Sequence, residues 1–203
     1  MKVNELLTPF LTALHVTSYD YNLDEEFKHV KNLEYLSNGH NGNYKSKDIY
    51  VLEHKNMEKI KEFIQRSLDY YTTKFLESTQ QVKPTISWTN KNPKGSRHHE
   101  HIHPNSILSG VFYFAIDDSA PIRFHNSKEW GLKLNYTKYN DFNSEVLMVP
   151  MKAGELIVFP SNSKHSVPVN RSDDVRYSLS FNTFIKDKII GDINALTYLN
   201  VEE

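Results

Sequence analysis

Hydrophobic and polar positions change their spacing near the middle of the chain. Between Leu52 and Ser78, apolar side chains recur every three or four residues, which is the spacing of one face of a helix. These positions are Met57, Ile60, Ile64, Leu68, Tyr71 and Phe75. The pattern predicts an amphipathic packing helix, and the chain up to about Gln81 is expected to be mostly helical or irregular.

After Lys83 the pattern is that of short strands separated by Pro, Gly, Asn, Asp and Ser. The predicted strands are Thr85–Thr89, Ile107–Phe114, Pro121–Phe124, Val146–Val149, Glu155–Phe159 and Arg176–Phe184. Many short strands at such intervals favour an antiparallel sandwich or barrel. We therefore expect a mainly β protein in which a helical or mixed elaboration, residues 1–83, packs on a barrel core, residues 84–203.

One long polar segment, His125–Glu145, interrupts the predicted strands and contains four aromatic side chains. A loop of this length in a compact domain is typically a lid or a binding loop, or else a loosely ordered insertion. We expect a lid and leave the insertion open.

Composition excludes several classes of protein. The chain of 203 residues has no cysteine, which excludes disulfides, thiolate metal sites and cysteine nucleophiles. Its 24 basic and 25 acidic residues give a net charge of −1, so no general attraction to nucleic acid or anionic membranes is expected. No apolar stretch reaches the ~20 residues that span a bilayer, and Met1–Leu14 lacks the features of a signal peptide. We expect a cytoplasmic protein, and its oligomeric state, monomer or homodimer, is left open.

Four of the ten histidines lie within the run His98–His103. On a strand, residues two apart point the same way, so His99, His101 and His103 would share a face. Two imidazoles at this spacing can converge on one iron, zinc, copper or nickel ion. A surface pair of histidines without a metal is the alternative.

A further histidine strengthens the prediction of a metal site. The buried strand predicted at Glu155–Phe159 leads through a short polar turn to His165. A barrel could bring His165 opposite the first pair, so the predicted metal ligands are His101, His103 and His165.

The last predicted strand has one polar and one apolar face. Period two puts Arg176, Ser178, Ser180 and Asn182 on one side and Tyr177, Leu179 and Phe181 on the other. An inward-facing guanidinium needs an anionic partner, and a ligand carboxylate with a hydrogen bond from Ser178 would supply one. The alternative is a surface ion pair of Arg176 with Asp173 or Asp174.

These motifs resemble a known family. The runs His101-Ile102-His103-Pro104-Asn105-Ser106 and Leu108–Tyr113 look like the first signature of Fe(II)/2-oxoglutarate oxygenases of marine bacteria and their phages. The second signature is similar to Gly154–Ser161, His165 and Arg176–Asn182, and Gly42–Ser46 is similar to a short N-terminal motif of the same family.

The resemblance implies a double-stranded β-helix core, Fe(II) at one mouth and 2-oxoglutarate deeper inside. It implies that Arg176 and Ser178 hold the C5 carboxylate of 2-oxoglutarate, and we assign Asn105 of the first signature to the cofactor-binding residues as well. The implied reaction uses dioxygen and couples decarboxylation of 2-oxoglutarate to hydroxylation of an unknown small molecule or side chain.

The ligand set departs from the usual pattern of His-x-Asp/Glu and a distal histidine, because His103 occupies the carboxylate position. Aspartyl/asparaginyl β-hydroxylases, which also look similar, lack that carboxylate. Whether His103 binds the metal or lines the site is left open. A second interpretation, in which His98 and Glu100 are the two adjacent metal ligands, is also left open.

Three other functions remain as alternatives. A cupin of another activity would keep the histidines without needing Arg176, and a metal-stabilised binding module would not turn over 2-oxoglutarate. A zinc hydrolase would need a general base, for which Glu100 is the candidate. The fold does not select among amino-acid side chains, nucleobases, lipids and small metabolites as substrate.

Overall fold

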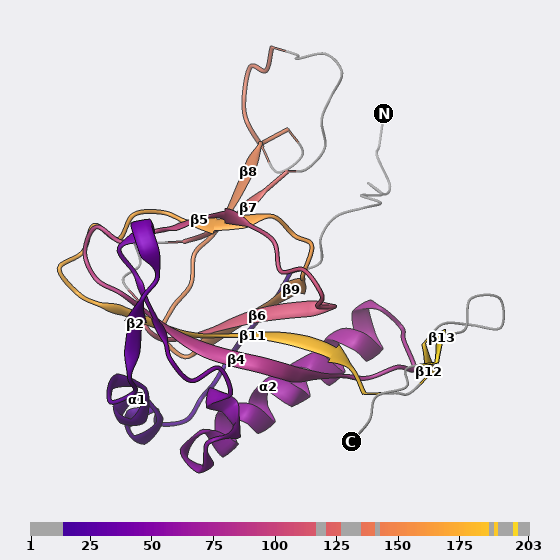
Figure 1. Cartoon of the computed structure of the whole chain (residues 1–203). Helices are drawn as coiled ribbons and strands as arrows, with labels where there is room; N and C mark the ends of the chain where they lie inside the picture. Colours follow the sequence, from indigo (N-terminus) through magenta and orange to yellow (C-terminus); the bar gives the residue numbers. More distant parts are fainter. Residues whose placement is uncertain are drawn as a thin grey trace.

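A computed structural model describes residues 14–116, 121–126, 135–140, 143–186, 189–190 and 197–198 of the chain. Two antiparallel sheets face each other, and the helices cover the outer face of the larger sheet (Figure 1). The space between the two sheets is the part of the fold that matters most for function.

The larger sheet has seven strands in the order β1-β9-β6-β11-β4-β3-β2. In that order their bounds are His15–Ser18, Glu155–Pro160, Leu108–Ala115, Arg176–Ile185, Val82–Asn92, Tyr44–Ser46 and Tyr35–Ser37. The smaller sheet has the order β5-β10-β7-β8, with bounds His98–His101, His165–Val167, Ile122–His125 and Val146–Val149. A separate pair joins β12 (Ile189–Ile190) to β13 (Thr197–Tyr198).

The connections from β4 to β11 carry the chain back and forth between the two sheets. The strands β4, β6, β9 and β11 lie in the larger sheet, whereas β5, β7, β8 and β10 lie in the smaller one. Eight antiparallel strands wound between two facing sheets form a jelly roll, the architecture of a double-stranded β-helix. The predicted fold class is confirmed.

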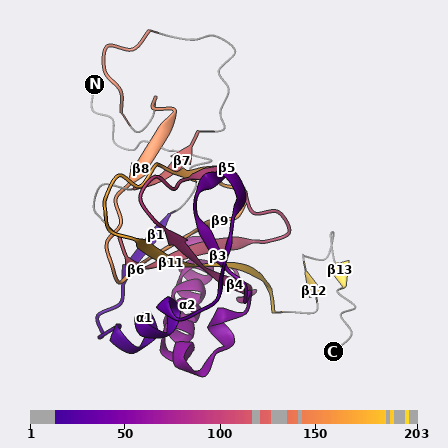
Figure 2. The same cartoon turned by 60° about the vertical axis from the view of Figure 1, so that its left-hand side comes forward.

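Two α-helices lie on the outer face of the larger sheet, α1 (Asp24–Lys31) and α2 (Glu58–Tyr70), as Figures 1 and 2 show. The predicted helix Leu52–Ser78 is shorter than expected because His54 has an extended backbone with ψ 137°. Short 3-10 turns, Val51–Glu53 and Lys55–Met57, precede α2, and a π-helical turn, Tyr71–Phe75, follows it. Within the part of the chain that the structure describes, no helix is both long and apolar enough to span a membrane.

Three short strands precede α2 in regions that the sequence pattern predicted as helical or irregular. Strand β1 pairs with β9 at one edge of the larger sheet, and the β2–β3 hairpin pairs with β4 at the other edge. The prediction was wrong for these strands, each of which has only three or four residues. Alternation of apolar and polar positions cannot be recognised over so few residues.

The central strand β11 separates the apolar core from the space between the sheets. Its residues Tyr177, Leu179 and Phe181 join the core that packs against α2, as the period-two pattern predicted. The alternating positions Arg176 and Ser178 line a cavity between the two sheets. A second apolar cluster borders the cavity and includes Tyr113, Ile122, Phe124, Met151, Ile157 and Phe159.

Gly110 in β6 allows the ring of Phe181 to pack directly on the backbone. A Cβ at this position would lie 2.3 Å from Cζ of Phe181 and 2.9 Å from the carbonyl oxygen of Ile157. We predict that Gly110→Ala lowers the free energy of unfolding by ~1–3 kcal/mol, the usual effect of overpacking a core. Urea unfolding measures this change, and the double variant with Phe181→Leu should recover part of the loss. A Gly110→Ala protein as stable as wild type would contradict this account of the core.

Candidate active site

Three histidines from the smaller sheet meet at the cavity between the sheets. His101 ends β5, His103 follows two residues later, and His165 begins β10. One ring nitrogen of each lies within 4.8 Å of one ring nitrogen of the other two, so the group could hold a metal ion. The structure therefore brings together the three histidines that the sequence predicted as ligands.

Backbone contacts orient these rings. Nδ1 of His101 donates to the carbonyl oxygen of His99 at 2.7 Å, and Nδ1 of His165 donates to the carbonyl oxygen of Ser163 at 2.8 Å. A histidine that donates through one ring nitrogen presents the lone pair of the other, which is the usual arrangement in metal sites. Nε2 of His165 lies 3.2 Å from Nε2 of His103. The backbone N–H of His103 donates a hydrogen bond to the carbonyl oxygen of Ser161.

Burial keeps these imidazoles neutral. Burial, with smaller contributions from neighbouring histidines, lowers the pKa of His103 to about 3 and that of His165 to about 4. Burial also lowers the pKa of His101. Neutral imidazole is the form that binds a transition metal, so the site has ligands in the correct protonation state at neutral pH.

His98 also lines the cavity, which the period-two pattern did not predict. His101 pairs with His165 and His98 pairs with Val167, so β5 has one extra residue between these positions. Such a bulge reverses the alternation of side chains and turns His98 toward the same space as His101. Nε2 of His98 is hydrogen bonded to Oδ1 of Asn92 at 2.6 Å.

The pairing of His98 with Glu100 as metal ligands finds no support in this geometry. Glu100 forms ion pairs with His125 at 3.2 Å and with Lys164 at 3.1 Å, and its side chain is half exposed. Glu100 is not among the residues that line the cavity. Glu100 is therefore not placed to act as the general base of a zinc hydrolase in this cavity.

The cavity has a volume of about 230 Å³ and extends from the histidines to the inner face of the larger sheet. Its walls consist mainly of polar side chains, and neither aspartate nor glutamate is among its lining residues. The lining residues include Lys45, Trp88, Asn90, Asn92, Tyr113, Arg176, Ser178 and Ser180.

Arg176 and Ser178 lie on the wall formed by β11. Both are buried, with 3% and 5% of their surfaces exposed, so the alternative of a surface ion pair between Arg176 and a nearby aspartate is wrong. Asp173 instead pairs with Lys94 at 2.6 Å. Burial lowers the pKa of Arg176 and raises that of the neighbouring Tyr113 to about 12, so Tyr113 keeps its hydroxyl proton.

Two further predictions concern Asn105 and the segment His125–Glu145. Asn105 is exposed at a turn with φ 58°, a conformation that asparagine tolerates, and it is not among the residues lining the cavity. The predicted lid, His125–Glu145, includes residues 127–134 and 141–142, which lie outside the described residues. Its role stays a prediction.

Sequence analysis missed several residues that line the cavity, above all Lys45, Trp88 and Tyr113. Tyr113 lies on β6, where period two places it on the same face as Val111, opposite the core residue Phe112. That alternation could have identified Tyr113. Lys45 and Trp88 belong to other strands, and only the order of the strands brings them to the site.

Sequence comparison indicates an oxygenase that uses iron and 2-oxoglutarate, and the jelly-roll fold agrees with this class. Residues 86–182 match the family model described as "Putative 2OG-Fe(II) oxygenase". This segment holds the three histidines and Arg176, and the match indicates a 2OG-Fe(II) oxygenase. Its co-substrates are therefore 2-oxoglutarate and dioxygen. A comparison with curated protein sequences gives no match.

Solved structures of low sequence identity share the fold. HygX from Streptomyces hygroscopicus, solved with nickel and 2-oxoglutarate bound, has 10% identity and a TM-score of 0.61, over 85% of this chain and 82% of HygX. A prolyl-4-hydroxylase from Pseudomonas putida has 13% identity and a TM-score of 0.57, over 84% and 92% of the two chains. SnoN, described as a non-heme alpha ketoglutarate dependent epimerase from nogalamycin biosynthesis, has 12% identity and a TM-score of 0.62, over 85% and 78%.

Two partly buried histidines make the stability of the metal-free protein depend on pH. Unfolded histidines take up protons near pH 6.5, whereas His98 and His103 in the folded state do so only at a pKa of about 3. The unfolded state then binds more protons below pH 6.5, so we predict that stability falls from pH 7 to pH 5. Each such histidine contributes up to ~1.4 kcal/mol per pH unit.

Urea unfolding in the presence of a chelator at several pH values measures this slope. His98→Asn should make the dependence shallower, whereas replacing the exposed His40 by glutamine should leave it as in wild type. An equal slope in wild type and His98→Asn would show that His98 is not kept neutral by the fold.

Proposed function

We propose that His101, His103 and His165 bind Fe(II), and that Arg176 and Ser178 bind the C5 carboxylate of 2-oxoglutarate. The observation that carries this proposal is the convergence of three neutral imidazoles and one buried guanidinium on a single cavity. When bound, iron with 2-oxoglutarate and dioxygen supplies C–H oxidation coupled to decarboxylation of 2-oxoglutarate to succinate. We propose hydroxylation of a small molecule or side chain as the outcome.

In this proposal the wall of β11 recognises the co-substrate. A guanidinium can form two parallel hydrogen bonds to a carboxylate, and burial strengthens such a pair. Ser178 is two residues from Arg176 on the same face of β11, and its hydroxyl can donate a hydrogen bond to the same carboxylate. Tyr113 is the Cα partner of Ser178 on the neighbouring strand and keeps its proton, so it is a further donor for the carboxylate.

A set of three histidines changes the charge of the site. In the usual set, one carboxylate ligand offsets part of the charge of Fe(II), whereas imidazoles offset none. The dianion 2-oxoglutarate would then supply the negative charge that the metal needs. We therefore propose that metal and co-substrate bind with positive coupling, each raising the affinity for the other.

Three broader proposals accompany this function. Residues 1–83 would form an elaboration that packs on the catalytic core, residues 84–203; its support is the packing of α2 on the larger sheet and the contribution of Lys45 to the cavity. We also propose cytoplasmic action without nucleic-acid partners, supported by the absence of cysteine and by the net charge of −1. A homodimer is proposed as the assembly to test by sedimentation.

The first prediction concerns the metal. His165→Ala and His103→Ala should each abolish stoichiometric Fe(II) binding in anaerobic titrations, because two imidazoles and water hold Fe(II) weakly. His103→Asp should retain binding, because it restores the usual carboxylate. The matched control is His99→Ala, which keeps the backbone carbonyl that orients His101. Tight stoichiometric binding in His103→Ala would remove His103 from the ligand set.

The second prediction concerns the co-substrate. Arg176→Ala should weaken binding of 2-oxoglutarate to the metal-loaded protein by ~2 kcal/mol, about 30-fold, because a charged and buried partner is lost. Isothermal titration calorimetry measures this affinity. Arg171→Ala, at an exposed position in the loop before β11, is the control and should bind 2-oxoglutarate as wild type does. Unchanged affinity in Arg176→Ala would place the carboxylate elsewhere.

A further inference from the structure

Lys45 is a second cation at the cavity, and the proposed function does not use it. It lies on β3 within Gly42–Ser46, the segment that the sequence analysis singled out, and it is half-buried. Its Nζ lies 4.6 Å from the centroid of the Trp88 ring, and the Trp88 ring lies 6.0 Å from that of His103. Lys45 therefore stands at the side of the cavity that contains the proposed metal ligands.

Strand register separates Lys45 from the proposed 2-oxoglutarate site. Lys45 is the Cα partner of Asn90 in β4, and Asn90 is the partner of Ser178 in β11. Two strand spacings of ~4.8 Å place the backbones of Lys45 and Ser178 about 10 Å apart across the sheet. One anionic group at Arg176 and Ser178 and another at Lys45 would thus occupy different parts of the cavity.

The charges around Lys45 favour an anion. Within the described residues, no carboxylate forms an ion pair with Lys45, whereas its neighbour Lys47 pairs with Glu34 at 3.0 Å. The amides of Asn38, Asn41 and Asn90 line the same cavity, and Asn90 is the cross-strand partner of Lys45. Burial lowers the pKa of Lys45, which shows that its ammonium is partly removed from water.

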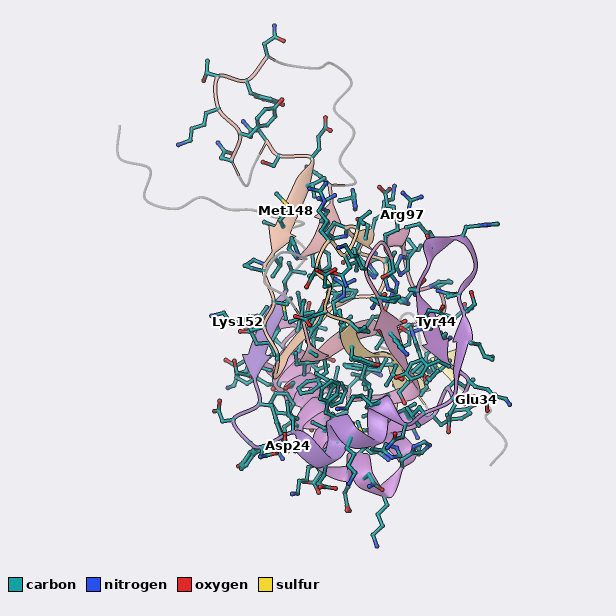
Figure 3. All side chains as sticks on the ribbon, turned by 90° about the vertical axis from the view of Figure 1, so that its left-hand side faces the viewer. Asp24, Glu34, Tyr44, Arg97, Met148 and Lys152 are labelled. Carbon is teal, nitrogen blue, oxygen red and sulfur yellow. The ribbon has the colours of Figure 1, made fainter. Side chains whose placement is uncertain are left out.

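The hairpin that carries Lys45 is fixed against β5. The carbonyl oxygen of Asn41 accepts a hydrogen bond from the backbone N–H of Arg97 at 2.9 Å, and the side chains of Asn41 and His99 are hydrogen bonded at 3.1 Å. Figures 1 and 2 show the β2–β3 hairpin standing beside β5, and Figure 3 labels Tyr44 on the hairpin and Arg97 next to β5. The backbone that carries Lys45 is therefore fixed beside the cavity before any ligand binds.

We propose that Lys45 binds an anionic group, a carboxylate or a phosphate, of the substrate that is oxidised, with the ring of Trp88 as the adjacent wall. The proposal rests on the proposed function and names the substrate class. The proposed 2-oxoglutarate site at Arg176 and Ser178 lies across the sheet from Lys45, so an anionic group of the substrate is the complement to the charge of Lys45. The anion fixes one end of the substrate while the rest of it extends toward the metal.

The test uses simple aromatic probes with the zinc-loaded, 2-oxoglutarate-loaded protein, in which no turnover occurs. The variant Trp130→Phe leaves Trp88 as the single tryptophan, so its fluorescence reports binding beside Lys45. Benzoate, phenyl phosphate and the neutral benzamide are titrated. We expect at least one anion to bind about ten-fold or more tightly than benzamide, and Lys45→Gln to abolish that preference. Comparison of the two anions distinguishes a carboxylate site from a phosphate site.

Two variants serve as controls. Lys45→Arg should keep the preference for anions, and so should Lys91→Gln, because Lys91 stacks on Tyr35 at 6.0 Å and does not line the cavity. Equal binding of all three probes, binding of none, or a preference that survives Lys45→Gln would overturn the proposal. A loss of 2-oxoglutarate affinity in Lys45→Gln would also overturn it, because Lys45 would then hold the co-substrate.

Failure of the proposed function would look different. If wild type binds no 2-oxoglutarate, the function is wrong, yet the three probes can still be titrated into the zinc-loaded protein alone. An anion preference that depends on Lys45 would then survive as a property of the cavity, without an oxidised substrate.

Discussion

The alternation of side chains along β11 is the constraint on which the rest of the structure depends. This strand lies between β4 and β6 and pairs with both, so both of its edges are hydrogen bonded. One face supplies Leu179 and Phe181 to the core under α2, and the other places Arg176 and Ser178 in the cavity. A shift of one residue in register would exchange these faces and bury the guanidinium among apolar side chains.

The smaller sheet provides the histidines of the site, which are oriented by backbone hydrogen bonds and by a bulge. Backbone carbonyls hold His101 and His165 through Nδ1, and the bulge in β5 adds His98 to the same wall. The proposed metal ligands and the cationic wall thus come from facing sheets, which explains why the jelly roll positions both. The N-terminal hairpin closes one side of the cavity and contributes Lys45.

Much of this arrangement could be predicted from the sequence, and the exceptions have physical causes. Strand β8 was predicted with its observed bounds, but β4 extends to Asn92, beyond the predicted end at Thr89. The polar residues Asn90 and Asn92 face the cavity and therefore lack the hydrophobic signal of a strand.

The histidines and Arg176 were found because each lies in a local pattern of period two or beside a buried strand. Lys45 and Trp88 could not be found in this way, because strands far apart in sequence bring them together. His98 was considered only as a partner of Glu100, because no local signal in the sequence indicates the bulge that turns it toward the cavity.

Anaerobic visible spectroscopy tests the central claim most directly. Fe(II) and 2-oxoglutarate are added to the purified protein without oxygen, because chelation of 2-oxoglutarate to iron gives a weak metal-to-ligand charge-transfer band. The account predicts that the band appears in wild type and is lost in Arg176→Ala at the same, sub-saturating concentration of 2-oxoglutarate. Iron binding without the band in wild type would contradict it and would leave a cupin-like metal site that does not use 2-oxoglutarate.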